Sequence, residues 1–228
     1  MQYPVPSEAF ASVEINEVKS QGHDISIFSL RRKNKLHKKL MKERHVNDLS
    51  TYSFDINSLL LFFKYIVFHP LALAVFFIWV SRCNYKKPMH LLKSYILIPS
   101  AVSCFLRVKK YKPDVVHMFW GHYPVMVGYL VKKHMINTKT SMFLGAHDLR
   151  IGYVGSRYFS RQADYCFTHN YKNFDLLERN GIDSKLFELV YRGIKINYHK
   201  QYIKKAPMEK ITILSAGRLI RSKGVMRL

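Results

Sequence analysis

The second half of the chain alternates between short apolar segments and helical segments, and this alternation restricts the fold more than any other feature. Near-continuous apolar strands are predicted at 114–118, 140–144, 163–167 and 186–190. Helices are predicted between them at about 122–136, 155–162 and 171–180. Strands that are buried on both faces and separated by helices are typical of parallel sheets. The sequence therefore predicts an α/β fold with a doubly wound, Rossmann-like parallel sheet.

The first thirty residues predict a helix followed by a strand. The helix covers 7–21 with Ser7 as its N-cap, and the strand covers 24–30. A doubly wound domain normally opens with a strand, but only Met1 to Tyr3 precede the helix. We therefore expect the natural start of the domain to lie upstream of this sequence.

Residues 56–80 are the most apolar part of the chain, and their length suits a transmembrane helix. Lys64 and the pair His69-Pro70 interrupt this segment. A charge at bilayer depth is costly and proline breaks or kinks a helix. The sequence thus favours two helices that pack on the sheet or dip into a membrane surface, with a single span as the alternative.

The formal net charge of +22 predicts an anionic partner. The densest basic segment, 31–44, lies just before the apolar segment 56–80. Basic charge beside an apolar surface is typical of peripheral proteins on anionic lipid. A solvated basic helix face is the alternative interpretation of 31–44.

The three cysteines are Cys83, Cys104 and Cys166, which are far apart and odd in number. This argues against a disulfide framework or a zinc site and favours a reducing compartment. The first residues lack the charged start and apolar run of a signal peptide. We expect a cytoplasmic protein on the inner face of the cytoplasmic membrane.

The last strand-like segment, 211–216, leads into a glycine-flanked loop with Gly217, Arg218 and Lys223. Glycine lets backbone N–H groups approach an anion, and the two cations neutralise it, so the loop predicts a phosphate site. An ordinary basic surface turn is the alternative. We expect a first domain over 1–194, a linker over 195–210 and the start of a second, truncated domain over 211–228.

Two histidines follow predicted strands, His122 after the first and His147 after the second. Ligand sites of doubly wound sheets lie at the carboxyl ends of strands, and histidine exchanges a proton near neutral pH. Asp148 is positioned to bias the charge of His147. The alternative for each is a histidine that only hydrogen-bonds the backbone, and His117, inside its strand, is expected to be structural. No third ligand supports a metal site.

Five segments in order carry a family resemblance. They are Pro6–Phe10 with Gly22–Asp24, Lys112–His117, Gly145–Asp148, Asp164–Thr168 with Asn173 and Leu177, and Ser215–Leu219 with Lys223 and Gly224. Together they resemble the retaining nucleotide-sugar glycosyltransferases of the GT-B fold in glycosyltransferase family 4, whose last motif reads V-G-R-L-x-x-x-K-G. The chain departs from the family at Arg192, where asparagine is common, and lacks the part that carries the family's paired glutamates.

The resemblance implies the N-terminal, acceptor-side half of a two-domain enzyme, with reaction in the cleft between the domains. Gly217, Arg218 and Lys223 would hold the donor diphosphate. His147 would lie near the sugar or the acceptor hydroxyl, with His122 as second choice, and Ser7 would contact substrate. The nucleotide sugar is a co-substrate, and neither a cofactor nor a metal is implied.

The implied reaction transfers a sugar, with retention, to a lipid-linked or polysaccharide acceptor in cell-surface polysaccharide or glycolipid synthesis. The sugar, the nucleotide and the acceptor stay open. Two other functions are compatible with the sequence: a non-catalytic, membrane-associated remnant of such an enzyme, and a basic nucleic-acid-binding protein. The last predicts cations clustered on one face with stacking aromatic rings, whereas here the cations spread over most of the chain.

Overall fold

The computed structural model describes residues 2–192. The chain divides after Ile194 into two units, and only the first is treated below. The predicted linker 195–210 and the segment 211–228, with Gly217, Arg218 and Lys223, lie outside the described residues. Their assignments stay predictions.

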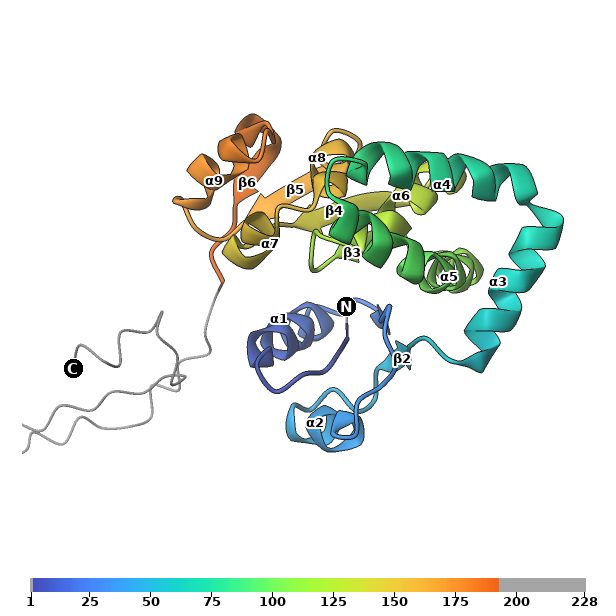
Figure 1. Cartoon of the computed structure of the whole chain (residues 1–228). Coiled ribbons are helices and arrows are strands. Elements are labelled where there is room, and N and C mark those ends of the chain that lie inside the picture. The colour runs from blue at the N-terminus through green and yellow to red at the C-terminus, as the bar shows by residue number, and fades with distance from the viewer. Residues whose placement is uncertain (1, 193–228) are drawn as a thin grey trace, which may run out of the picture. The chain divides into compact units, whose positions relative to one another are not determined.

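The four predicted strands of the second half form one parallel sheet in the order β3-β4-β5-β6 (Figure 1). The strands are β3 (Val115–Met118), β4 (Lys139–Phe143), β5 (Tyr165–Thr168) and β6 (Phe187–Leu189). The connections contain α6 (Val125–His134), α7 (Ala146–Ile151), α8 (Val154–Ser160), α9 (Asn173–Arg179) and a 3-10 turn at Ser184–Leu186. The predicted parallel α/β architecture is confirmed.

The strand order of this sheet is consecutive and contains no reversal. A second, two-stranded parallel sheet pairs β1 (Ser26–Phe28) with β2 (Ser50–Tyr52). A doubly wound sheet needs a point at which the strand order reverses, and neither sheet has one by itself.

The four-stranded sheet has one buried face and one partly exposed face. A row of residues in register is buried: Met118, Met142, Cys166 and Phe187. On the other face, Val115 is 54% and Tyr165 51% exposed. Crossovers between consecutive parallel strands share one hand, so their helices gather on one side of the sheet. The prediction that these strands are buried on both faces holds for β4, where Ser141 and Phe143 are buried as well, and is wrong for β3, β5 and β6.

The first helix is α1 (Ala9–Ser20), and its N-cap is Glu8 and not Ser7. Neither residue caps the helix through its side chain; the first turn is instead closed by backbone bonds from Glu8 N to Val5 O and from Ala11 N to Glu8 O. The predicted Ser7 cap is therefore wrong. A short helix, α2 (His37–Glu43), occupies the basic segment 31–44.

The apolar segment 56–80 is broken into two helices, as predicted. These are α3 (Ile56–Phe68) and α4 (Pro70–Asn84), which Figure 1 shows as two separate helices. Their axes bend by 108° at the junction. Asp55 caps α3 through a reciprocal pair of bonds with Ser58, and Pro70 opens α4. Proline is well tolerated in the first turn of a helix, where its missing N–H has no partner to lose.

The longest helix, α5 (Pro88–Tyr111), was not predicted from the sequence. It packs against α3, α4 and α6, and it supplies buried core residues, including Ile98, Val102 and Phe105. Among residues 2–192 it is the one helix long and apolar enough to cross a membrane, or one of two if α3 and α4 count as a broken span. Half of its apolar window is buried within the protein, as in the core helix of a globular domain.

Candidate functional site

A buried histidine–carboxylate pair lies at the carboxyl edge of the four-stranded sheet. His122 follows β3 and Asp148 lies in α7, which follows β4. His122 Nδ1 is 2.6 Å from Asp148 Oδ1, and Asp148 Oδ2 accepts a 3.0 Å bond from the backbone N–H of Gly145. Asp148 is 2% and His122 8% exposed. Because a carboxylate only accepts, the Nδ1 of His122 carries a proton in this bond, and in the neutral form of the ring Nε2 is the free acceptor.

The structure thus pairs Asp148 with His122, and not with its neighbour His147. His147 is exposed in α7 and has no side-chain hydrogen bond within the described residues. Successive residues of a helix point in different directions, so adjacency in sequence does not bring their side chains together. The two predicted histidines therefore occupy different settings: His122 is held in the interior, while His147 faces solvent.

The guanidinium of Arg192 lies among aromatic rings from three segments: the α1 helix and the segments after β3 and at the end of β4. Its Cζ is 4.2 Å from the ring centroid of Phe10, 4.3 Å from Phe143, 5.1 Å from Phe119 and 5.7 Å from Trp120. Its Nε is 3.1 Å from Oε1 of Glu14. A desolvated cation–π contact contributes up to about 2 kcal/mol. Arg192 therefore links α1 to the edge of the sheet.

Two carboxylates, Glu14 in α1 and Glu8 just before it, lie near this arginine or near the rings around it. Desolvation raises the pKa of Glu14, against the opposing charge of Arg192. Desolvation also raises the pKa of Glu8, although a hydrogen bond from Trp120 and the charges of Arg44 and His122 act in the other direction. Carboxylates with raised pKa values beside a histidine are typical of sites that move protons.

Two further histidines lie near the same edge. His117 Nδ1 is 2.8 Å from Ser141 Oγ, and the ring of His169 stacks on Phe143 with centroids 5.5 Å apart. Desolvation and then the charge of Arg192 lower the pKa of both histidines, although part of His117 is solvent-exposed. These shifts favour the neutral form of both imidazoles. The Nδ1 of His169 is buried without a hydrogen-bond partner among the described residues.

We call this group the sheet-edge cluster. Its polar members are Glu8, Glu14, His117, His122, Asp148, His169 and Arg192, and its aromatic members are Phe10, Phe119, Trp120 and Phe143. Sequence reasoning identified His122 and suggested the wrong partner for Asp148, and it missed Arg192, Glu14 and the aromatic rings as site residues. Ser7 precedes Glu8 and is exposed, with no side-chain bond within the described residues.

Metal and thiol chemistry find little support in residues 2–192. These residues contain no group of three or more histidine, cysteine or acidic side chains that could hold a metal ion. The three cysteines are free and buried, and burial raises the pKa of each thiol to about 12. A thiol that stays protonated is a poor nucleophile.

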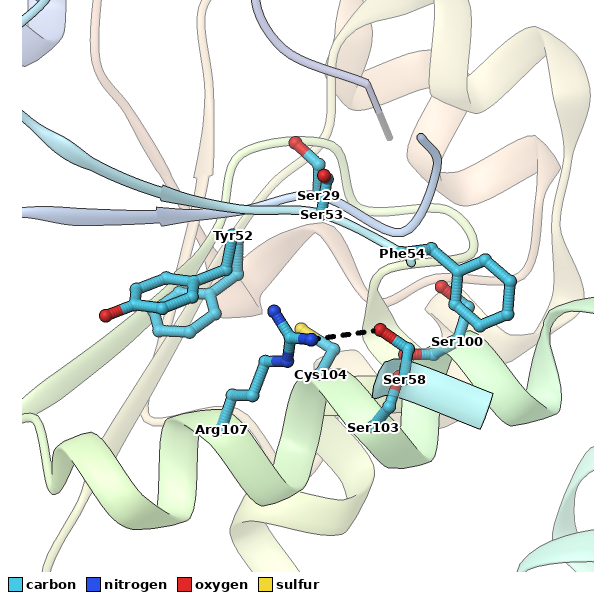
Figure 2. Close-up of a pocket in the computed structure, with 10 residues that line it drawn as sticks. Ser29, Tyr52, Ser53, Phe54, Ser58, Ser100, Ser103, Cys104 and Arg107 are labelled. Atoms are coloured by element: carbon cyan, nitrogen blue, oxygen red, sulfur yellow. Dashed lines mark hydrogen bonds between the residues drawn. The ribbon is translucent and has the colours of Figure 1, made fainter. Parts of the chain in front are cut away.

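A small cavity near Arg107 is structural. Arg107 donates to Asp55 Oδ1 at 2.7 Å and so ties α5 to the N-terminal cap of α3. It also donates to Ser58 Oγ at 3.2 Å, and Figure 2 marks this bond with a dashed line. The cavity, of about 10 Å³, has room for roughly one water molecule. It is too small for a substrate.

The chain matches no known protein family, and neither a curated protein nor a solved structure is similar to it.

Proposed function

We propose that this chain forms the acceptor-side domain of a retaining glycosyltransferase that uses a nucleotide-sugar donor. The acceptor is a lipid-linked or polysaccharide glycan at the inner face of the cytoplasmic membrane. In this proposal the two parallel sheets together represent the doubly wound N-terminal half of a GT-B enzyme. The donor is held by the segment that contains Gly217, Arg218 and Lys223.

The observation that carries the proposal is the convergence of separate motif segments on one sheet edge. Glu8 and Phe10 come from the first segment that resembles family 4, His117 from the second and Asp148 from the third. Phe10 of the first segment stacks on Phe119, two residues after the second segment, with centroids 6.0 Å apart. His122, five residues after the second segment, bonds Asp148 of the third. The carboxyl ends of neighbouring parallel strands share one edge in any parallel sheet, so the support comes from the first segment, whose Phe10 also reaches this edge.

The proposed chemistry needs a base for the acceptor hydroxyl and a grip on the leaving diphosphate. His122 suits the first role, because Asp148 fixes the proton on Nδ1 and leaves Nε2 to accept another. His147, which is exposed beside this pair, is available to contact the sugar or the acceptor. Arg218 and Lys223 are proposed to stabilise the charge that develops on the diphosphate.

An exposed apolar surface on α3 and α4 supports an acceptor that is carried on lipid. We call this surface the apolar corner, and its most exposed members are Val67 (71%), Phe68 (73%) and Leu71 (82%). Contiguous apolar patches on soluble monomers are uncommon and mark interaction sites. With a net charge of +22, attraction to anionic lipid adds to burial of the patch.

The experiment is a transfer assay with full-length chain, acidic-lipid vesicles that carry extracted polyprenyl-linked glycans, and a panel of labelled nucleotide sugars. We expect label in the lipid fraction with one donor, and release of the nucleoside diphosphate. His122→Ala and His147→Ala are expected to slow transfer without weakening donor binding, whereas Lys223→Ala is expected to weaken donor binding. Exposed Lys172, outside the cluster, supplies the control Lys172→Ala.

Two results would reject the proposal in different ways. Donor binding without transfer under any condition would favour a non-catalytic remnant. Unchanged donor binding by the Lys223→Ala variant would remove the diphosphate assignment.

A further inference from the structure

A second, larger cavity of the described residues lies apart from the aromatic rings of the sheet-edge cluster. Its volume is about 220 Å³, and it is formed by the α7–α8 segment, the end of α9 and the residue that precedes α5. Its polar lining is Lys87, Asp148, Ser156, Arg157, Arg179 and Asn180. Neither the sequence motifs nor the proposed reaction uses the cationic part of this lining.

The cavity is strongly positive. Lys87, Arg157 and Arg179 line it, and none of them forms an ion pair within residues 2–192. The one carboxylate in the lining, Asp148, already accepts bonds from His122 and from the N–H of Gly145. Three cations that converge without a free carboxylate form a site for an anion with several oxygens.

The backbone around these cations is held in place. The Nζ of Lys87 donates to Gly152 O at 2.7 Å, and Asn180 Nδ2 donates to Leu149 O at 3.0 Å. Gly152 has φ +59°, which ends α7 in a left-handed conformation. A side chain at Gly181 (φ +66°) would meet the guanidinium carbon of Arg157 at 3.0 Å, so this arginine lies flat against the glycine. Lys87 and Arg157 thus have defined contacts, although the side chains of all three cations are exposed. A cation held in place loses less entropy when it binds a ligand than a mobile one does.

We propose that the cavity of Lys87, Arg157 and Arg179 binds a phosphoryl group, as a phosphate ester or diphosphate. Arginine supplies paired N–H donors that match phosphate oxygens, and lysine supplies a point charge. The phosphoryl group has two possible sources, a soluble phosphate ester and a lipid headgroup. The second source is suggested by Tyr85 (65% exposed) and Met89 (60% exposed), which flank Lys87 in sequence. This inference does not depend on the glycosyltransferase proposal.

The test measures binding of inorganic pyrophosphate to the full chain by titration calorimetry at low salt. Arg157→Ala/Arg179→Ala is expected to weaken binding by about tenfold or more, since each charge-assisted bond is among the strongest in proteins. Matched controls are Lys86→Ala, next to Lys87, and Arg161→Ala, just after α8. Both side chains are exposed and outside the lining, so both variants should bind as the parent does.

The variant Arg218→Ala/Lys223→Ala separates this site from the proposed donor site. Pyrophosphate binding that survives in this variant and disappears when Arg157 and Arg179 are also replaced supports the cavity. If Arg218→Ala/Lys223→Ala alone abolishes binding, or if Arg157→Ala/Arg179→Ala binds as the parent does, the inference is overturned while the donor assignment stands.

The source of the phosphoryl group is decided by a second pair of measurements. Glycerol 3-phosphate is titrated in solution, and phosphatidylcholine vesicles with and without phosphatidic acid are tested by sedimentation. A defect of Arg157→Ala/Arg179→Ala that is confined to phosphatidic acid vesicles identifies a lipid headgroup, and a defect in solution alone identifies a soluble ester. A variant with no defect in either measurement contradicts the inference.

Discussion

The sheet-edge cluster and the apolar corner depart from ordinary burial in opposite directions. In the cluster, Asp148 is 2% and His122 8% exposed, and the side chain of Arg192 is 18% exposed. At the apolar corner, aliphatic and aromatic side chains face outward, with Leu71 82% exposed. Each arrangement costs free energy unless something compensates for it.

The compensation is visible in one region and not in the other. Asp148 gains two hydrogen bonds, and Arg192 gains four aromatic rings and Glu14. The apolar corner has no compensating contact within the described residues. The Asp148–His122 pair is thus satisfied within its own fold, whereas His169 Nδ1 and two nitrogens of Arg192 still lack hydrogen-bond partners among the described residues. The corner gains stability only by meeting another apolar surface.

The largest expected effect on stability distinguishes a core residue of α4 from a residue of the apolar corner. Phe76 is fully buried, whereas Phe68 is 73% exposed. Phe76→Ala is expected to lower the free energy of unfolding by about 3–5 kcal/mol, because it removes buried area and leaves a cavity. Phe68→Ala should change it by less than about 0.5 kcal/mol. Urea titration followed by circular dichroism measures both, and equal losses would show that the corner is packed.

Asp148→Ala tests whether the cluster is stabilised from within. We expect a loss of about 3 kcal/mol, because His122 and the N–H of Gly145 both lose a buried partner. His147→Ala, one residue away and exposed, is the control and should be within about 0.5 kcal/mol of the parent. If Asp148→Ala were as stable as the control, the Asp148–His122 pair would contribute little to the free energy of unfolding.

The apolar corner should be sensitive to substitution only when a membrane is present. Phe68→Ser/Leu71→Ser is expected to weaken binding to acidic vesicles by about a hundredfold, since each large apolar side chain contributes roughly 1.5–3 kcal/mol when buried. Ile136→Ser is the control, because Ile136 is 92% exposed but lies after α6. Equal vesicle sedimentation of both variants would remove the corner as the membrane contact.

The smallest expected effect on stability concerns Asp164, a carboxylate at the amino end of β5. The sheet-edge cluster lies at the opposite, carboxyl ends of the strands. Asp164 accepts 2.8 Å bonds from Lys132 Nζ and from Thr140 N. Desolvation raises the pKa of Asp164, but these bonds outweigh it and hold the pKa below its ordinary value. The folded pKa is thus lower than the unfolded one, so the stabilisation is present above about pH 4 and fades as the pH falls below it.

Asp164→Asn is therefore expected to cost about 1–2 kcal/mol at pH 7, and the difference from the parent should shrink toward pH 2. Unfolding by urea at several pH values measures it. Asp175→Asn, at an exposed position in α9, is the control. A difference that stays constant with pH would mean that the loss arises from packing and not from charge.

The sequence predicted most of the strands but fewer of the helices that pack around them. Continuous apolar segments revealed β3 to β6, and Pro70 revealed the break between α3 and α4. The long helix α5 was missed because Pro99 and several serines interrupt its apolar pattern. In the structure Ser94 and Ser103 bond carbonyls of their own helix, which satisfies their hydroxyls in the interior.

The candidate site was predicted only in part for a similar reason. The rule that ligands lie at the carboxyl ends of parallel strands singled out His122 and His147, which follow β3 and β4 in the structure. Which side chains meet there depends on the direction in which each helical residue points. It also depends on the packing of α1 against this edge of the sheet. Sequence spacing alone therefore predicts the wrong contacts. It suggests that Asp148 pairs with its neighbour His147, and it gives no sign that Arg192 contacts Phe10.

The consecutive order of the four-stranded sheet makes β3 and β6 its two borders within the described residues. A border strand has one side of its main chain without a ladder partner. Deuterium should therefore enter the outer amides of β3 and β6 sooner than those of β4 and β5. A further strand could extend the sheet at either border while leaving the existing pairings unchanged.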